Sequence, residues 1–321
     1  MDTKSKAQFS KRMLHPRYWL TWILFALWWL VAQLPMKLQF FFGRILGRIM
    51  FRFAHRRRLI ARKNIELCFP SLSEAEREEL VKKNFQATAI GLFETGMAWF
   101  GSNRRLMKLF EVKGLENIRQ YIDNGQGVLL LALHFTPLEM LGICMNNLIH
   151  STDLTYRPHR NPVYDFVQAR CRARQNPSFT ALAAGDVRGM VRSLKNGRCI
   201  SYLPDQDYGP SHSVFAPFYG IPTATVVAMA RLAAMAKVKV VPMFCVRKDD
   251  DSGYEIEAMA PLENYPSGDD IADATRLNAH VEACINRQPE QYLWVHRRFK
   301  TRPPGEADVY NIPKRKSRRR R

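Results

Sequence analysis

The stretch Gly127–Met140, GVLLLALHFTPLEM, combines the end of an apolar run with a turn and the start of a helix. The run Val128–Leu133 is typical of a buried β-strand, and it ends on His134. The pair Thr136–Pro137 fits the N-cap and first position of a helix, with Glu139 in its first turn. Open α/β sheets bind ligands at the carboxyl ends of their strands. His134 is therefore the first candidate functional residue.

Strand-like runs alternate with helical stretches along the rest of the chain. The other expected strands are Cys199–Leu203, Val238–Val246 and Tyr254–Ala260, and the amphipathic stretches include Val163–Arg174 and Thr223–Ala236. An earlier helix begins at a capping box formed by Ser73 and Glu76. This alternation predicts the α/β class, with a central mostly parallel sheet and helices on its faces.

His134 and Glu139 form a candidate catalytic pair. Positions i and i+5 do not share a face of one helix, but a strand end followed by a tight turn can fold the glutamate back onto the imidazole. Such a carboxylate fixes the ring tautomer while the other nitrogen takes a proton. The structural alternative is a histidine that only ends a strand, with a glutamate that complements the helix dipole. The chain contains no GxSxG motif, so a base here is expected to activate a substrate hydroxyl.

The formal charge of +20 indicates a polyanionic neighbour: nucleic acid, anionic lipid or a phosphorylated substrate. Much of the excess lies near the start of the chain, where residues 1–63 hold fourteen Lys and Arg and a single acid, Asp2. The six cysteines are scattered, with no CxxC and no metal-site spacing, which favours reduced thiols and no metal site.

Three segments precede the expected globular body. Residues 1–17 are basic, and residues 18–34 form an apolar helix expected to anchor the chain to a membrane, as a short span or as a re-entrant or interfacial segment. Residues 36–62 are expected to form a basic amphipathic helix in the headgroup plane. Its arginines Arg44, Arg48, Arg52 and Arg56 follow one another at i+4 spacing. An ordinary surface helix with a solvated charged face is the alternative.

The tail, residues 306–321, ends in PKRKSRRRR. Such a run suggests a nuclear or nucleic-acid signal, but beside an apolar anchor it equally suits a segment held against anionic headgroups.

The chain resembles the late, or secondary, acyltransferases of lipid A biosynthesis in Gram-negative bacteria. The matching stretches lie between residues 15 and 303 and cover almost the whole chain. They are HPRYWLTW (His15–Trp22), ARKNIELCFP (Ala61–Pro70), ETGMAWF (Glu94–Phe100), HFTPLE (His134–Glu139), YRPHRNP (Tyr156–Pro162), PDQDYG (Pro204–Gly209) and QYLWVHRRFKTRP (Gln291–Pro303).

The resemblance implies a single αβα acyltransferase domain, residues 63–305, at the cytoplasmic face of the inner membrane. It implies transfer of a fatty acyl group, lauroyl by default with palmitoleoyl or myristoyl as alternatives, from acyl carrier protein. The acceptor would be a hydroxyl on an acyl chain of the anionic, Kdo-bearing lipid IVA precursor. No cofactor, metal or nucleic acid is expected.

The resemblance also assigns site residues. It makes His134 the general base and Glu139 its partner, and it marks Arg172 and Asp205 as required for activity. The candidate substrate-binding residues are Arg157, Arg174, Tyr208, Arg297 and Arg298. For the arginines the alternative is a surface ion pair, and for Asp205 it is turn chemistry.

Two other functions remain open at this point. A glycerophospholipid acyltransferase would use the same histidine and acid chemistry on a lysophospholipid. A membrane-tethered protein that binds anionic polymers would use the basic segments, and its binding would be salt-sensitive and independent of His134.

Overall fold

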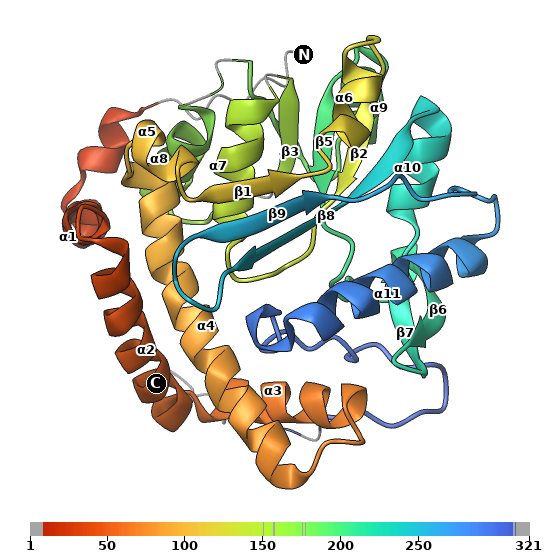
Figure 1. The fold of residues 1–321 in the computed structure, drawn as a ribbon, viewed down its shortest axis with the longest axis horizontal. Helices are drawn as coiled ribbons and strands as arrows, with labels where there is room; N and C mark the ends of the chain where they lie inside the picture. The colour runs from red at the N-terminus through yellow and green to blue at the C-terminus, as the bar shows by residue number, and fades with distance from the viewer. Residues whose placement is uncertain are drawn as a thin grey trace.

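The fold is built on a seven-stranded sheet in a computed structural model (Figure 1), which describes residues 9–149, 151–156, 158–174, 176, 178–310 and 312. The sheet has the order β1-β9-β8-β2-β5-β3-β4. Its strands are β1 (Phe110–Lys113), β2 (Val128–Leu131), β3 (Thr152–Tyr156), β4 (Ala181–Ala183), β5 (Cys199–Tyr202), β8 (Lys239–Arg247) and β9 (Tyr254–Ala258). Of the strand pairs in the described part of this sheet, only β8 with β9 is antiparallel. The predicted mixed α/β class with a mostly parallel sheet is confirmed.

Helices cover both faces of this sheet (Figure 1). They are α1 (Trp19–Ala32), α2 (Met36–Phe53), α3 (His55–Cys68), α4 (Glu74–Phe100), α5 (Asn103–Met107), α6 (Glu116–Ile122), α7 (Leu138–Leu148), α8 (Pro162–Ala173), α9 (Val187–Lys195), α10 (Ala228–Ala236) and α11 (Asp270–Arg287). A separate antiparallel pair is formed by β6 (Ser213–Phe218) and β7 (Ile221–Val226). The capping box of Ser73 and Glu76 opens α4 as predicted.

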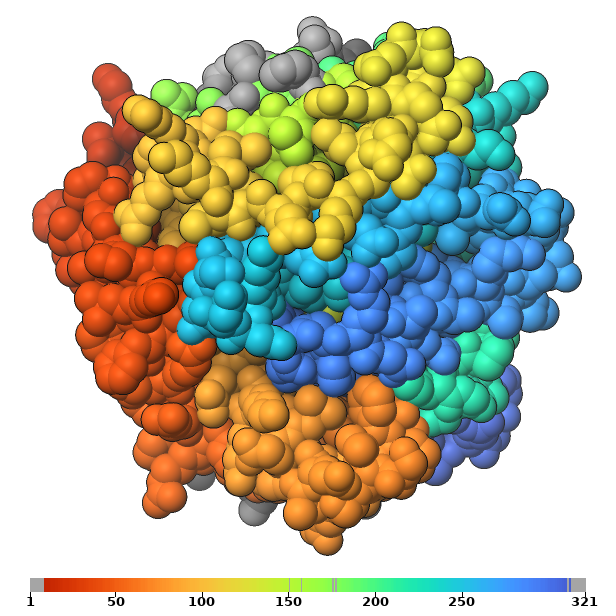
Figure 2. All heavy atoms as spheres, in the orientation of Figure 1, coloured from red at the N-terminus to blue at the C-terminus, as the bar shows by residue number. Residues whose placement is uncertain are grey.

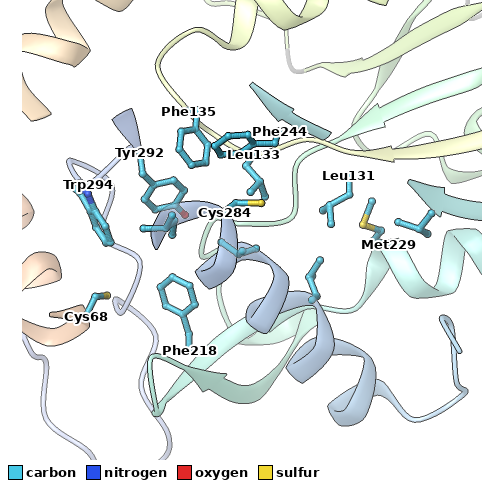
Figure 3. Close-up of a cluster of buried hydrophobic side chains, with 14 of the residues drawn as sticks. Cys68, Leu131, Leu133, Phe135, Phe218, Met229, Phe244, Cys284, Tyr292 and Trp294 are labelled. Carbon is cyan, nitrogen blue, oxygen red and sulfur yellow. The ribbon is translucent and has the colours of Figure 1, made fainter. Parts of the chain in front are cut away.

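Strand β2 lies at the centre of the sheet, and all four of its residues are fully buried. Its alternate side chains enter different clusters: Leu129 and Leu131 join the one with α3, α9, α10 and α11, while Val128 and Leu130 join the one with α6 and α7. Figure 3 shows Leu131 in the first cluster. Burial on both faces explains why the segment reads as a continuous apolar run.

Some predicted element bounds differ from the structure. Strand β2 ends at Leu131, and α7 begins at Leu138 with Pro137 as its N-cap, one residue later than expected. The helix predicted for Thr223–Ala236 is wrong in its first part, because that part is strand β7. Its β-branched residues favour an extended strand that pairs with β6.

The basic amphipathic segment, residues 36–62, is two helices rather than one. Helix α2 ends at Phe53, Ala54 leaves the helical conformation with ψ 54°, and α3 continues past the expected domain boundary at residue 63. The break lets α3 bury its own apolar side, which includes Ile60 and Ile65. It also divides the predicted arginine stripe, since Arg56 belongs to α3.

Helix α2 lies directly against α4 because two glycines face it. A Cβ atom at Gly43 would lie 2.7 Å from Cγ1 of Ile90, and one at Gly47 would lie 2.4 Å from Cα of Gln86. On the same side, Arg44 forms an ion pair with Asp251. Helix α2 is thus fixed to the globular body along this face.

A buried ion pair ties α4 in turn to the sheet. Nη1 of Arg247, in β8, lies 2.8 Å from Oε1 of Glu94, and both residues are buried. Breaking such a pair from one side costs about 3–5 kcal/mol, because the remaining charge stays buried. Helix α4 is therefore held at a set position between the chain's first helices and the sheet.

The outward faces of α1 and α2 are apolar and exposed. On α1 the exposed side chains include Leu20, Ile23, Leu24, Leu27 and Leu30, and on α2 they include Phe41, Phe42, Ile49 and Phe53. These helices form one edge of the molecule (Figure 2). Among the described residues, no helix has both the length and the apolar content needed to cross a bilayer. The helix predicted for residues 18–34 is present over Trp19–Ala32. Its role as a membrane anchor stays a prediction.

We expect Gly47→Ala to lower the free energy of unfolding by about 1–3 kcal/mol, the usual cost of forcing extra atoms into a close-packed contact. The added methyl group would meet the backbone of α4, which has to shift. Urea denaturation measures the change. Gly142→Ala is the matched control, because apart from its chain neighbours and the adjacent backbone of α7 no atom lies within 4 Å of its Cβ position. That variant should gain about 0.5–1 kcal/mol from helix propensity. Equal stability of the two variants would contradict the proposed contact.

Candidate active site

His134 follows strand β2, and the chain around it pairs with a segment from the far end of the sequence. The backbone N–H of Leu293 donates to the His134 carbonyl at 3.0 Å, and the N–H of Thr136 donates to the Gln291 carbonyl at 2.8 Å. Between them Phe135 forms an isolated bridge with Tyr292, and Figure 3 shows these two rings side by side. His134 therefore lies in a turn outside any helix, and strand-like pairing of this turn with residues 291–293 fixes its position.

The carboxylate of Asp205 binds His134 at two points. Oδ2 accepts the backbone N–H of His134 at 2.8 Å, and Oδ1 lies 2.6 Å from the ring nitrogen Nδ1. Asp205 follows strand β5, which is the direct neighbour of β2, so the two strand ends bring the residues together. Burial alone would raise the pKa of Asp205, but the charge and hydrogen bonds of His134 outweigh it and hold the pKa below its ordinary value.

The predicted pairing of Glu139 with the imidazole is contradicted. Glu139 Oε2 accepts hydrogen bonds from Nε1 of Trp99 at 2.9 Å and from Nε of Arg172 at 3.1 Å, and Oε1 binds Nη2 of Arg172. The reason is the start of α7, which directs Glu139 toward α4 and α8 instead of back along the strand end. The carboxylate partner of the ring is Asp205.

Arg172 is held in place from two sides. The Glu139 carboxylate accepts hydrogen bonds from two nitrogens of the Arg172 guanidinium. The backbone carbonyl of Arg172 accepts a hydrogen bond from Nδ2 of Asn146 at 3.0 Å. Burial alone would lower the pKa of Arg172, but the nearby Glu139 carboxylate outweighs it, and the pKa lies above its ordinary value. Arg172 is thus a fixed, permanent cation.

A cavity of about 300 Å³ contains these groups. His134, Glu139 and Arg172 all lie on its wall. Most of the remaining wall is apolar and comes from α7, β2, β3 and β8, with Leu130, Ala132, Leu138, Leu141, Ile143, Met145, Leu154 and Met243 among the lining residues. An imidazole, a guanidinium and a largely apolar lining therefore share one space, which suits a substrate with a polar reacting end and a hydrocarbon chain.

Three predicted substrate-binding residues, Arg174, Tyr208 and Arg297, do not line this cavity. Arg174 donates to the carbonyls of Ala98 and Gly101, where α4 ends. Tyr208 is exposed. Arg297 pairs with Asp308. None of these contacts tests a role toward substrate, which stays a prediction for these residues. Arg157 lies outside the described residues.

Arg298, predicted as a substrate-binding residue, lies in the interior of the structure, and a role toward substrate stays a prediction. Its side chain is buried, and its guanidinium donates to the carbonyl of Ala224, to Oγ1 of Thr225 and to Oδ1 of Asn278. It is oriented inward because these acceptors on β7 and α11 replace the water that its charge loses on burial. Arg298 serves the fold.

Two residues near the site were not singled out from the sequence. Trp99 binds Glu139, and its place in ETGMAWF was the only available signal. His296 accepts the N–H of Asp207 through Nε2 at 3.2 Å. Burial lowers the pKa of His296 to about 4, so its ring is neutral at neutral pH and Nδ1 carries the proton.

The arrangement is suited to general base catalysis. Asp205 occupies Nδ1 of His134 and stabilises the charged ring that forms when Nε2 takes a proton. All six cysteine thiols are free. Across the described ranges, no three His, Cys, Asp or Glu side chains are grouped so as to hold a metal ion.

Comparisons with known proteins agree on one family. Bacterial lipid A biosynthesis acyltransferase is the family that matches residues 6–301. A lipid A biosynthesis lauroyltransferase of Escherichia coli (strain K12) is 43% identical over 304 residues, covering 94% of this chain and 98% of the relative. A palmitoleoyltransferase of the same pathway and organism is 42% identical over 306 residues, covering 95% and 99%. A myristoyltransferase, also of that organism, is 31% identical over 315 residues, covering 97% of both chains.

We expect the neutral His134 ring to carry its proton on Nδ1, because the Asp205 carboxylate accepts it there. Nitrogen-15 NMR of histidine-labelled protein reports this tautomer, with the signal assigned by its loss in His134→Gln. Asp205→Asn should shift the population toward the Nε2–H tautomer. The matched control Glu139→Gln should leave it unchanged, because Glu139 binds Trp99 and Arg172. A tautomer change in the Glu139 variant alone would contradict the geometry.

Proposed function

Because the chain belongs to the bacterial lipid A biosynthesis acyltransferase family, we propose that it moves a fatty acyl group from acyl carrier protein onto a lipid hydroxyl of the Kdo-bearing lipid IVA precursor. The observation that carries this proposal is the Asp205–His134 pair, whose imidazole lies on the wall of a largely apolar cavity. A thioester donor brings its own activated carbonyl, so the enzyme needs a base for the acceptor and no nucleophile of its own.

His134 acts as the general base. Its Nε2 takes the proton of the acceptor hydroxyl while that oxygen attacks the thioester carbonyl. When the tetrahedral intermediate collapses, the ester forms and the carbon–sulfur bond breaks. The leaving thiolate then receives the proton from the imidazolium. Asp205 stabilises the positive ring between these two transfers.

Arg172 supplies positive charge to the reacting carbonyl, and Glu139 is its positioning residue. The guanidinium shares the cavity wall with His134, and the two-point contact with Glu139 fixes its plane. A preorganised cation is most effective where charge develops in the transition state and water is excluded. In this assignment Glu139 acts on catalysis through Arg172.

The cavity beside His134 holds the acyl chain of the donor. Apart from His134, Glu139 and Arg172, most of its lining residues are apolar. Lauroyl is the preferred chain in this proposal. The relatives named for lauroyl and palmitoleoyl transfer are almost equally similar to this chain, so chain length has to be read from the lining residues. One methylene there changes selectivity by only about 1–3 kcal/mol.

The outward faces of α1 and α2 rest on the cytoplasmic face of the inner membrane. Exposed apolar side chains on both helices suit the boundary between headgroups and hydrocarbon, and the exposed Arg48, Arg52 and Arg56 suit anionic headgroups. The same excess of positive charge suits the anionic acceptor and an acidic carrier protein.

We expect Asp205→Asn to lower kcat for acyl transfer by about 10²- to 10⁴-fold, the usual range for a disabled general base. The assay uses purified enzyme with lauroyl acyl carrier protein and the lipid IVA acceptor. A lysophospholipid acceptor in a parallel reaction tests the glycerophospholipid alternative. Asp207→Asn is the matched control, because Asp207 lies in the same loop but binds Thr301. That variant should keep near wild-type kcat.

A double-mutant cycle tests the positioning role of Glu139. Glu139→Gln and Arg172→Gln should each lower kcat/KM, and the double variant should be about as slow as the slower single variant. If the two losses multiply instead, Glu139 and Arg172 act independently and the positioning role is wrong.

We expect Phe53→Asp to weaken binding to vesicles of phosphatidylglycerol and phosphatidylethanolamine by about 10- to 100-fold. Burial of a large apolar side chain is worth about 1.5–3 kcal/mol, and Phe53 is 75% exposed. Ile271→Asp is the control, since Ile271 is 56% exposed but lies on α11. Vesicle sedimentation measures both. Equal binding by the two variants would overturn this orientation.

A further inference from the structure

A second cavity lies next to the catalytic turn and shares no lining residue with the first. Its volume is about 370 Å³. Its walls are Met50, Ala54, Arg57, Phe85, Thr88, Leu293, Val295 and His296. We propose that this cavity binds the hydroxyacyl chain of the acceptor and so presents its hydroxyl to His134. This inference rests on the proposed function and extends it to a specific acceptor site.

The cavity is built from the two segments that hold the catalytic turn. Leu293 donates its backbone N–H to the His134 carbonyl at 3.0 Å. Thr88 lies about one turn of α4 before Gly91, where an added Cβ would lie 3.1 Å from the Thr136 carbonyl oxygen. A chain lodged between these walls therefore lies beside the turn that carries the base.

The lining matches a hydrocarbon chain that carries a polar group. Met50, Phe85, Leu293 and Val295 provide apolar surface. Oγ1 of Thr88 is buried without a hydrogen-bond partner among the described residues. A buried unpaired hydroxyl costs free energy. The carbonyl that joins the hydroxyacyl chain to its headgroup can satisfy it, which leaves the hydroxyl of the chain for His134.

His296 adds a hydrogen-bond donor to the same wall. Its Nε2 accepts the Asp207 N–H, and the ring is neutral because burial lowers its pKa to about 4. Nδ1 therefore carries a proton that a chain oxygen can accept. A phospholipid chain carries a polar group only at its ester link, whereas the hydroxyacyl chain carries a hydroxyl as well. A cavity with two polar groups beside a base therefore favours the hydroxyacyl chain.

The charge around the cavity fits an anionic amphiphile. Arg57 is exposed, and its Nη1 donates to the Val295 carbonyl at 3.0 Å. The exposed Phe53 lies at the end of α2, beside the cavity residue Ala54. Cationic and apolar surface thus meet at this cavity, as a lipid with a phosphorylated head requires.

Photo-crosslinking of the wild-type enzyme tests the site directly. The probe is the acceptor with a diazirine at the end of its hydroxyacyl chain, and mass spectrometry maps the adducts. We expect adducts on Met50, Phe85 and Val295. Adducts confined to Met145 and Met243 of the first cavity would overturn the proposal. Stronger labelling of the second cavity by a diazirine phosphatidylethanolamine would overturn it as well, since a bilayer lipid would then be the occupant.

Two variants give a kinetic readout. Ala54→Phe fills the cavity and should raise the acceptor KM at least 10-fold while the donor KM stays unchanged. Ala234→Phe, in a different cavity, should change neither. Thr88→Val keeps the side-chain shape and removes only the unpaired hydroxyl. It should therefore preserve stability, keeping this test usable if Ala54→Phe does not fold, and raise the acceptor KM several-fold.

An unchanged acceptor KM in folded Thr88→Val would overturn the proposed site. A wild-type enzyme that transfers no acyl group to the acceptor would instead refute the proposed function, and the crosslinking result separates that outcome from a wrong location.

Discussion

One buried carboxylate organises the site. Asp205 accepts a hydrogen bond from the backbone N–H of His134 and contacts its ring nitrogen Nδ1. It thereby fixes where the residue lies and leaves Nε2 as the ring nitrogen that Asp205 does not occupy. The contact is possible because β2 and β5 are neighbours whose carboxyl ends point the same way. Because both halves of the contact involve one residue, the loop after β5 and the turn after β2 cannot move independently.

A second polar group works alongside the first without touching its carboxylate. Trp99, Glu139 and Arg172 come from three helices, α4, α7 and α8, and each makes hydrogen bonds within the group. The cavity wall carries both this group and His134. In the proposed reaction, the base and the cation therefore each have a carboxylate partner of their own, Asp205 for His134 and Glu139 for Arg172.

The sequence predicted the strand, the turn and the place of His134, because apolar patterning and turn chemistry act over a few residues. Through the resemblance it also named acids and arginines, among which Asp205, Glu139 and Arg172 lie in hydrogen-bonded groups near His134 while their roles stay predictions. It could not say which carboxylate meets the ring, since Glu139 is near in sequence whereas Asp205 becomes near only through the order of strands. The inward position of Arg298 was hidden for the same reason, because its acceptors on β7 and α11 are distant in the chain. The break at Ala54 carried no proline or glycine to mark it.

Helix α4 contacts both helix α2 at the molecular surface and the turn that carries His134. Gly47 of α2 packs against the middle of α4, and Gly91 of α4 packs against Thr136 in the catalytic turn. The ion pair between Glu94 and Arg247 connects α4 to the sheet. At both glycines the backbones are so close that a larger side chain would fit only if one of them shifted. The position of α2 and the position of the turn that carries His134 are thus both tied to α4. In the orientation proposed above, this would fix the height of the imidazole above the lipid.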